Sequence, residues 1–323
     1  MGVNPPSSPA VEARGLVRLF GEKRAVDGVD LDIPRGQIYG FLGPNGAGKS
    51  TTVRMLTTLL NPTSGTARVA GHDIAGDTEN VRLRIGVALQ ESALDPKQTG
   101  REILDMQGRL YGLDRAARHE RIADLERLVD IGDAMDAMVS TYSGGMKRRL
   151  DLAAALVHKP EVLFLDEPTT GLDPVSRASV WAEVRRLNEE MGMTIFLTTQ
   201  YLEEADALAH RVGIIARGRI VADGTPAELK RSIGSDVVIV SVGEGQGALA
   251  GDTLRGVNGL DHVEVKGDRV IVGVSDGGAA LSPVAVALSG AGVKVNELTL
   301  RTPTLDDVFL EMTGNRMEEG ETA

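Results

Sequence analysis

The residues of this chain that most directly imply chemistry occupy positions 43–51 and read Gly43-Pro44-Asn45-Gly46-Ala47-Gly48-Lys49-Ser50-Thr51. A glycine-rich turn leaves backbone N–H groups unobstructed, so that they can converge on phosphate oxygens. In this spacing Lys49 reaches the β- and γ-phosphates of a nucleotide, and the Ser50 hydroxyl suits Mg²⁺. The pattern predicts a nucleotide-phosphate site rather than an ordinary glycine-rich turn.

The segments beside this turn agree with that prediction. The apolar run Ile38–Leu42 predicts a buried strand, and residues 50–60 predict a helix. A helix that begins at the turn adds the positive end of its dipole to the phosphate site.

Two carboxylates follow a second apolar run, Leu163-Phe164-Leu165-Asp166-Glu167. In an enzyme with such a phosphate loop, Asp166 can hold Mg²⁺ through its water shell. Glu167 is then placed to orient or deprotonate the attacking water. The alternative is a strand that ends in acidic surface residues; the upstream loop favours the catalytic interpretation.

A third motif, Ser143-Gly144-Gly145, predicts the start of a helix. A serine hydroxyl and two unobstructed N–H groups at a helix N-terminus form an anion site, although a plain helix start is the alternative. One phosphate loop needs only one phosphate site. The second site therefore predicts a two-fold dimer, in which each subunit completes the nucleotide site of the other.

The surrounding pattern alternates strands with helices. Residues 11–33 predict a small antiparallel unit, and the apolar runs 66–70, 85–89, 162–165 and 194–198 predict further strands. Between residues 95 and 142 apolar residues recur at helical spacing, namely Ile103, Met106, Leu110, Ile122, Leu125 and Leu128-Val129. The fold class predicted is α/β, with a parallel sheet at its core.

A composition shift near Lys230 predicts a second domain. Its expected order is strand, helix, hairpin, helix, strand, as in a ferredoxin-like fold. A capping box, Thr304 to Asp307, predicts the start of a last helix. The predicted domains are a disordered leader (1–10), a main domain (11–230) with a helical subdomain at about 93–142, a C-terminal α+β domain (231–314) and an acidic tail (315–323).

Composition excludes several classes of protein. The chain has 323 residues, no cysteine and a net charge of -11. Without cysteine there is no disulfide framework or thiolate metal site, and a reducing compartment is expected. The acidity argues against nucleic acid as a partner. The chain has no apolar run of roughly 18 residues to span a membrane, and its N-terminus has no signal-peptide pattern.

The ordered motifs resemble those of the nucleotide-binding domain of an ATP-binding-cassette protein over residues 11–230. Residues 43–51 resemble the Walker A motif and 163–167 the Walker B motif. Gln90 matches the Q-loop, Tyr142 to Met146 the family signature, and Gly171-Leu172-Asp173 the D-loop. Phe20 matches the aromatic residue that stacks on adenine, with core packing as the alternative.

The resemblance implies ATP and Mg²⁺ as cofactors and a role for each motif. Lys49 and the loop backbone bind phosphates, and the metal site is formed by Ser50, Gln90 and Asp166. Glu167 polarises water and Asp173 communicates across the dimer. The nucleotide site of the partner subunit is completed by Ser143, Gly144 and Gly145.

This chain departs from the family in two motifs. The signature carries Tyr142 and Met146 where Leu and Gln are more usual, and neither supplies a γ-phosphate contact. Gln200, in Thr198-Thr199-Gln200, replaces the usual histidine. Glutamine donates a hydrogen bond but takes up no proton. We therefore expect Glu167 to carry any base role and Gln200 to act as a neutral sensor.

Residues 199–206 and 305–314 resemble ATPase subunits of daunorubicin-resistance-type drug exporters. The resemblance implies a homodimer that energises the export of drugs or other hydrophobic small molecules. It also implies a separate membrane permease, a place on the cytoplasmic face of the membrane, and an assembly or regulatory role for the C-terminal segment. The alternative for Val308-Phe309-Leu310 is a helix that packs its apolar face within the chain.

Two other functions remain open at this point. One is a soluble cassette ATPase of translation or DNA repair, although such proteins tend to carry tandem cassettes or long coiled coils. The other is a nucleotide-gated regulatory module that scarcely turns over, which Gln200 permits.

Overall fold

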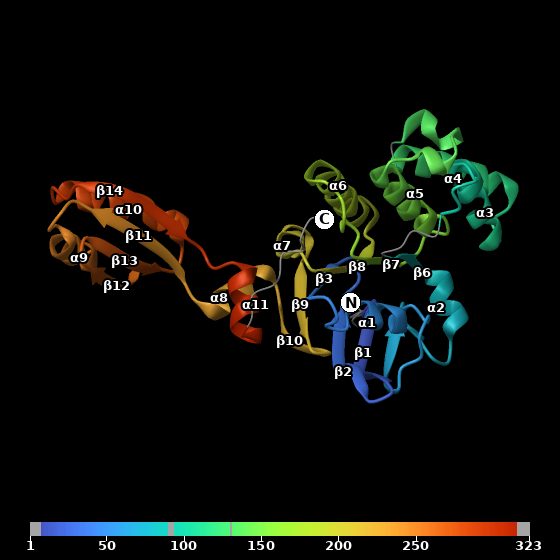
Figure 1. Cartoon of the computed structure of the whole chain (residues 1–323), viewed down its shortest axis with the longest axis horizontal. Helices are drawn as coiled ribbons and strands as arrows, with labels where there is room; N and C mark the ends of the chain where they lie inside the picture. Colours follow the sequence, from blue (N-terminus) through green and yellow to red (C-terminus); the bar gives the residue numbers. More distant parts are fainter. Residues whose placement is uncertain (1–7, 90–93, 130, 315–323) are drawn as a thin grey trace, which may run out of the picture. The chain divides into compact units, whose positions relative to one another are not determined.

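The computed structural model describes residues 8–89, 94–129 and 131–314 (Figure 1). The chain forms two compact units, and the boundary between them falls at Pro226 and Ala227. The first unit has two sheets and the second has one, and each unit has a hydrophobic core of its own.

The first unit is built on a six-stranded sheet of order β10-β9-β3-β8-β7-β6. Its strands are β3 (Ile38–Leu42), β6 (Ile85–Ala88), β7 (Val162–Asp166), β8 (Thr194–Thr199), β9 (Arg211–Ala216) and β10 (Arg219–Gly224). All neighbours are parallel except β9 and β10. Every residue of β3, β7 and β8 is buried, as expected of central strands covered on both faces. Parallel pairing brings the carboxyl ends of β3, β7 and β8 to one edge of the sheet.

A four-stranded antiparallel sheet of order β2-β1-β4-β5 completes the non-helical part of this unit. It contains β1 (Val11–Phe20), β2 (Lys23–Ile33), β4 (Ser64–Val69) and β5 (His72–Asp73). Along the chain, helix α1 (Lys49–Leu56) lies between β3 and β4, and helix α2 (Thr78–Arg84) lies between β5 and β6. The predicted antiparallel unit is confirmed. Helix α1 is shorter than predicted, because Thr58 adopts a left-handed conformation with φ of 62°. Ala10, at the end of the predicted leader, is buried and donates to the Ile33 carbonyl at 2.8 Å.

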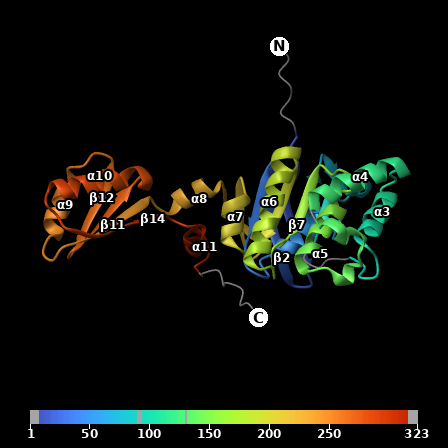
Figure 2. The same ribbon diagram turned by 90° about the horizontal axis from the view of Figure 1, so that it is seen from above.

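A group of helices is inserted between β6 and β7 (Figure 2). It comprises α3 (Gly100–Leu110), α4 (Arg115–Val129), the short 3₁₀ segments η1 (Gly132–Asp136) and η2 (Val139–Thr141), and α5 (Gly144–Leu156). Ile103, Ile122 and Leu125 are buried as their spacing predicts. Met106 and Leu110 also lie on α3, as their helical spacing predicts, but their side chains are exposed. The face of α3 that packs inward is instead formed by Gly100, Ile103, Leu104 and Gly108.

Two more helices of the first unit flank β8 in sequence. They are α6 (Pro174–Met191) and α7 (Leu202–Leu208). Helix α6 begins at an Asp173 N-cap and ends at Gly192, in the left-handed conformation that favours glycine at this position.

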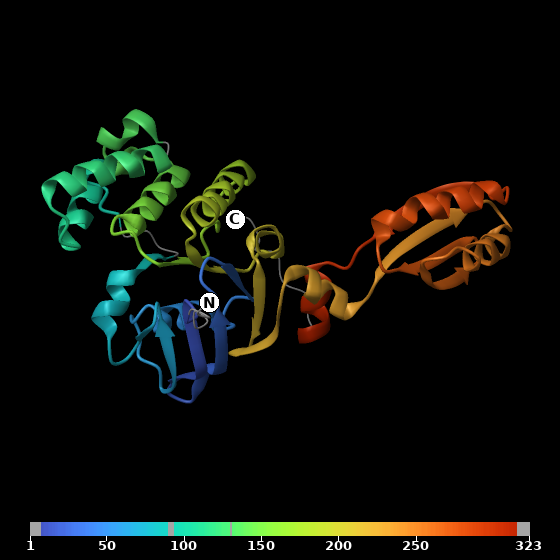
Figure 3. The same ribbon diagram turned by 180° about the vertical axis from the view of Figure 1, so that it is seen from behind.

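The second unit confirms the predicted ferredoxin-like order. After α8 (Pro226–Ile233) come β11 (Asp236–Val242), α9 (Gly247–Arg255), β12 (Leu260–Lys266), β13 (Arg269–Val274), α10 (Gly277–Gly290), β14 (Val295–Arg301) and α11 (Leu305–Thr313). The antiparallel sheet has the order β12-β13-β11-β14. Helices α9 and α10 pack against its apolar face (orange to red in Figure 3).

The last helix begins as predicted. Thr304 and Asp307 form a reciprocal capping box at its N-terminus. Val308 and Phe309 are buried within this single chain, which agrees with the alternative that the helix packs its apolar face at home.

Candidate nucleotide site

The glycine-rich turn connects β3 to α1 at the carboxyl edge of the six-stranded sheet. Two of its glycines have no room for a side chain. A Cβ on Gly43 would lie 2.4 Å from the Ile215 carbonyl oxygen, and one on Gly48, whose φ is 113°, would lie 2.6 Å from the Ala25 carbonyl oxygen. The backbone therefore follows a path open to glycine alone. This path leaves Asn45 and Gly46 exposed, while Ala47 is buried and its carbonyl accepts from the Gly218 N–H at 2.9 Å.

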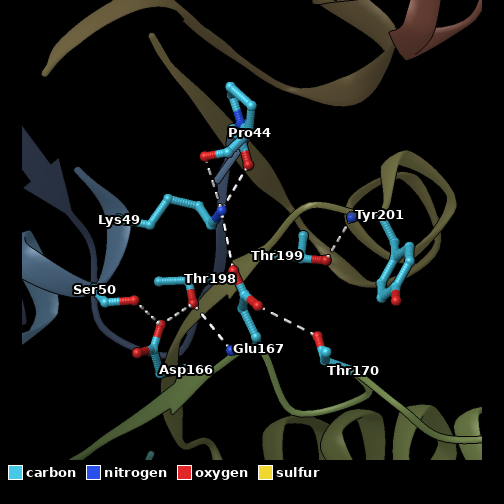
Figure 4. A network of polar contacts seen from close by, with 10 residues as sticks. Pro44, Lys49, Ser50, Asp166, Glu167, Thr170, Thr198, Thr199 and Tyr201 are labelled. Carbon is cyan, nitrogen blue, oxygen red and sulfur yellow. Dashed lines mark hydrogen bonds and ion pairs between the residues drawn. The ribbon is translucent and has the colours of Figure 1, made fainter. Parts of the chain in front are cut away.

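Lys49 is buried at the centre of the site (Figure 4). Its Nζ donates to the carbonyl oxygens of Gly43 at 2.7 Å and Pro44 at 3.2 Å. The same atom forms an ion pair with Glu167 Oε1 at 3.0 Å. The predicted phosphate-binding cation and the predicted catalytic carboxylate are thus in direct contact.

Ser50 and Asp166 are also brought together. The Ser50 hydroxyl donates to Asp166 Oδ1 at 3.2 Å, and Thr198 Oγ1 donates to the same oxygen at 2.5 Å. A hydroxyl and a carboxylate are hard oxygen donors of the kind that Mg²⁺ accepts when phosphates and water supply its other ligands. This donor set fits the predicted metal.

The backbone of Glu167 orients its side chain. Its φ of 49° is unusual for a residue other than glycine. The conformation is held by hydrogen bonds from the Glu167 N–H to the Thr198 carbonyl at 3.1 Å and to Thr198 Oγ1 at 3.0 Å. Thr170 Oγ1 donates to Glu167 Oε2 at 3.3 Å. A local conformation fixed by its surroundings in this way is common at active sites.

Thr198 is the residue of this site whose role the sequence did not reveal. It is fully buried on β8, and its hydroxyl serves both Asp166 and Glu167. The available signal was a polar residue at the carboxyl end of an apolar run that neighbours the Walker B strand.

Gln200 follows β8 directly and is half-buried. The residue before it anchors the phosphate loop, because the Thr199 carbonyl accepts from the Gly43 N–H at 3.2 Å. Thr199 Oγ1 accepts from the Tyr201 N–H at 2.9 Å. The backbone on either side of Gln200 is therefore fixed next to the start of the glycine-rich turn.

The Ser143-Gly144-Gly145 motif lies in the helical group, apart from the network of Figure 4. Ser143 is the N-cap of α5, and its hydroxyl accepts from the Met146 N–H at 3.2 Å. Ser143 and Gly144 are exposed, and a Cβ on Gly144 would meet no atom within 4 Å. The donors at this helix start are open to a ligand from outside the chain.

Asp173 caps the next helix, α6. Its carboxylate accepts from the N–H groups of Val175 and Ser176 at 3.0 Å each and from Ser176 Oγ at 2.5 Å. These hydrogen bonds, first of all the one from the Ser176 side chain, lower the pKa of Asp173. Ser176 Oγ would lie 3.6 Å from a Cβ on Gly145, so the start of α6, which Asp173 caps, and the signature lie side by side.

Three predicted residues stand outside these networks. Phe20 is 48% exposed with the Arg18 guanidinium 4.7 Å from its ring centre, so the core-packing alternative is wrong and adenine stacking stays a prediction. Thr51 follows Ser50 on α1 and is half-buried. Gln90 lies outside the described residues.

No helix within the described ranges is long and apolar enough to cross a membrane.

Two protein-family models match the chain. The model described as ABC transporter matches residues 26–170, and the one described as ATP-binding protein DrrA1-3-like, C-terminal domain, matches residues 224–313.

Several curated relatives match over nearly the whole chain. The daunorubicin/doxorubicin resistance ATP-binding protein DrrA of Streptomyces peucetius is 45% identical over 99% of this chain and 97% of its own. The Nod factor export ATP-binding protein I of Burkholderia lata is 39% identical over 97% of this chain and 100% of its own.

Solved structures agree on the fold of the first unit. The cbiO1 protein of Clostridium perfringens, part of an ABC transporter complex, has a TM-score of 0.65 and 25% identity over 70% of this chain and 94% of its own. An ATP-binding cassette solved as a dimer with ADP and phosphate, 23% identical, has a TM-score of 0.60 over 67% of this chain and 98% of its own. With both family models and full-length relatives in agreement, the chain belongs to the ATP-binding subunits of ABC transporters, in the branch of the drug-resistance protein DrrA.

Proposed function

We propose that this chain hydrolyses ATP as a homodimer and thereby energises export of hydrophobic small molecules through a separate membrane subunit. The observation that carries the proposal is the convergence of Lys49, Ser50, Asp166 and Glu167 at one edge of the parallel sheet. These four side chains supply a phosphate cation, two metal ligands and a water-activating carboxylate.

The nucleotide changes the partner of Lys49 in this scheme. Lys49 leaves Glu167 and binds the β- and γ-phosphates, while backbone N–H groups of the glycine-rich turn after Pro44 surround the phosphate oxygens. Ser50 and Asp166 would hold Mg²⁺, which supplies charge neutralisation between the phosphates. Thr198 keeps Asp166 in place for this role.

Glu167, released from Lys49, accepts a proton from the attacking water. Its orientation is preset by the hydrogen bonds between its N–H and Thr198. Gln200 donates a hydrogen bond to the γ-phosphate without taking up a proton. Phe20 offers the adenine an exposed aromatic face.

The homodimer follows from the open helix start at Ser143. Ser143 and Gly144 are exposed, and Gly145 is half-buried, on the same chain whose phosphate loop is already built around Lys49. In a two-fold pair, this second anion site of one subunit meets the nucleotide of the other. In this dimer Asp173, which lies beside the signature, is at the interface between the two copies.

The cargo is proposed from the relatives. The name of DrrA describes resistance to daunorubicin and doxorubicin, and the name of the Burkholderia lata relative describes Nod factor export. Cargo of an amphiphilic kind and a place at the cytoplasmic face of the membrane, held there by the permease, are consistent with these names.

A soluble ATPase of translation or repair is a weaker candidate. The net charge of -11 disfavours a polyanionic partner. The similarity to transporter subunits over 99% of the chain also favours export.

The deciding experiment measures phosphate release by the purified chain, alone and together with its membrane subunit in lipid vesicles. Coupling to transport predicts that the membrane subunit raises turnover and that cargo raises it further. Turnover that never responds to a membrane partner, together with salt-dependent binding to RNA, would contradict the proposal.

A further inference from the structure

We propose that Glu204 is a positioning residue that couples the Asp173 end of α6, which faces the partner subunit, to the Gln200 segment of the subunit's own nucleotide site. This inference rests on the proposed function, because it assumes a homodimer and the sensor role of Gln200.

Glu204 joins three segments that are distant in the sequence. Its side chain on α7 is fully buried. Oε1 accepts two hydrogen bonds, from Thr169 Oγ1 at 2.8 Å and from Trp181 Nε1 at 2.9 Å. Thr169 lies between the catalytic Glu167 and the D-loop, and Trp181 lies on α6. One oxygen atom therefore ties the Walker B end, α6 and α7 together.

The same face of α6 makes a second contact with the Gln200 segment. Asp173, Arg177 and Trp181 are spaced four residues apart, so they lie on one face of the helix. The Arg177 guanidinium lies 4.4 Å from the centre of the Tyr201 ring. Tyr201 directly follows Gln200, and Glu204 lies about one turn further along the chain. Both contacts therefore link the beginning of α6 to the residues that follow the γ-phosphate sensor.

The D-loop is attached to this link through its backbone. The Thr169 carbonyl accepts from the Leu172 N–H at 3.2 Å, and Leu172 precedes Asp173. Thr169 thus uses its carbonyl for the D-loop and its hydroxyl for Glu204. A displacement of Asp173 by the partner subunit would be transmitted to Glu204 by two routes, one through Thr169 and one through the face of α6.

Stability alone does not explain a carboxyl group at this position. Oε2 of Glu204 is buried, and burial raises the pKa of Glu204. A well-packed apolar side chain avoids the desolvation that such a group suffers. What the carboxyl group provides instead is a fixed geometry, since two donors from different segments meet one acceptor.

The chain carries its own reporter for this link. Trp181 is the single tryptophan of the sequence, and its indole N–H is one of the two donors to Glu204. Its fluorescence therefore reports on the environment of Glu204, and loss of that signal in Trp181→Phe verifies the source.

The experiment uses the purified full-length chain and four variants. Glu204→Leu and Thr169→Val break the link, while Glu204→Gln keeps an oxygen that accepts from both donors. Thr57→Val is the matched control, because it removes another buried threonine hydroxyl of the same unit, one that donates to the Val53 carbonyl at 2.8 Å. ATP affinity, turnover, the Hill coefficient for ATP and the ATP-induced change in Trp181 emission are measured for each.

The inference predicts a defect in coupling with intact binding. Glu204→Leu and Thr169→Val should lower kcat by up to about a hundredfold, the size of effect that a misplaced catalytic group produces, with ATP Kd unchanged. Their Hill coefficient should fall towards about 1 and their Trp181 response to ATP should disappear. Glu204→Gln should recover most of the kcat, the Hill coefficient and the Trp181 response, and Thr57→Val should match the wild type.

Three results would overturn the inference, and they can be told apart. If the Glu167→Gln protein fails to dimerise with ATP, the proposed function falls and this inference falls with it. If that protein dimerises but Glu204→Leu retains wild-type kcat, Hill coefficient and Trp181 response, only the role of Glu204 is refuted. An equal loss in Glu204→Leu and Thr57→Val would also refute it, since that pattern indicates general destabilisation.

Discussion

Lys49 Nζ lies 3.0 Å from Glu167 Oε1, with both side chains almost entirely buried. The proposed phosphate-binding cation and the proposed water-activating carboxylate are therefore paired with each other in this structure. In the proposed function, a nucleotide must separate them before either can act. This exchange of partners gives the account its first prediction.

Glu167→Gln should abolish turnover, with phosphate release at least about a hundredfold lower, because the general base is lost. ATP should still bind, as tightly as in the wild type or more so, because Lys49 no longer pairs with an anion. Glu161→Gln, just before the other end of the same strand, is the control and should hydrolyse ATP normally. Substantial hydrolysis by the Glu167→Gln protein would refute the assignment of the base.

Gln200→Ala should lower turnover while ATP binding persists. The change removes a donor to the γ-phosphate but leaves Lys49 and the glycine-rich turn untouched. Loss of a single donor of this kind lowers the rate by about 100-fold to 1000-fold. Steady-state kinetics and equilibrium binding of ATP measured side by side separate the two effects. A variant with unchanged turnover would show that Gln200 is not a sensor.

Thr198→Val should weaken the metal site. The substitution keeps the shape of the side chain but removes the hydroxyl that donates to Asp166 and accepts from the Glu167 N–H. We expect the Mg²⁺ concentration for half-maximal activity to rise about tenfold, as for other partners of metal ligands. Thr194→Val is the control, because that buried threonine accepts from the Gly36 N–H at the opposite end of β8. An equal Mg²⁺ requirement in the two variants would contradict the role of Thr198.

Asp151 should make stability depend on pH. This carboxyl group on α5 is 3.3 Å from Arg148, but burial outweighs that attraction and raises its pKa from 3.8 to about 6. Because the folded state holds the proton more tightly, the stabilisation is complete below about pH 4 and is lost as the pH rises through about 6.

The free energy of unfolding of Asp151→Asn should therefore rise relative to the wild type over that range, by roughly 2–3 kcal/mol. Urea unfolding of both proteins at several pH values between 4 and 7 measures the difference, and pH effects common to both cancel. A constant difference would show that Asp151 has an ordinary pKa.

Much of this structure could be predicted from patterns in the sequence. The strands that end at Leu42 and Asp166, the antiparallel unit and the ferredoxin-like order follow from local apolar runs and turn residues, and each is found as predicted. These features depend on neighbours in the sequence, so a single chain reveals them.

The features that the sequence did not reveal depend on pairing between distant segments. Thr198 and Glu204 act through partners more than twenty residues away in the sequence, and neither has a local pattern that marks its role. The spacing of Ile103, Met106 and Leu110 predicted helix α3 correctly. It did not show that Met106 and Leu110 face outward, or that Gly100 and Gly108, which have no apolar side chain, belong to the buried face.

The central claim is that two copies of this chain close on ATP, and one measurement tests it most directly. The mass of the full-length Glu167→Gln protein in solution is determined with ATP and Mg²⁺, with ADP, and without nucleotide. The account predicts a doubling of mass with ATP and Mg²⁺ only. A protein that binds ATP yet stays monomeric, both in solution and within its membrane complex, would contradict it.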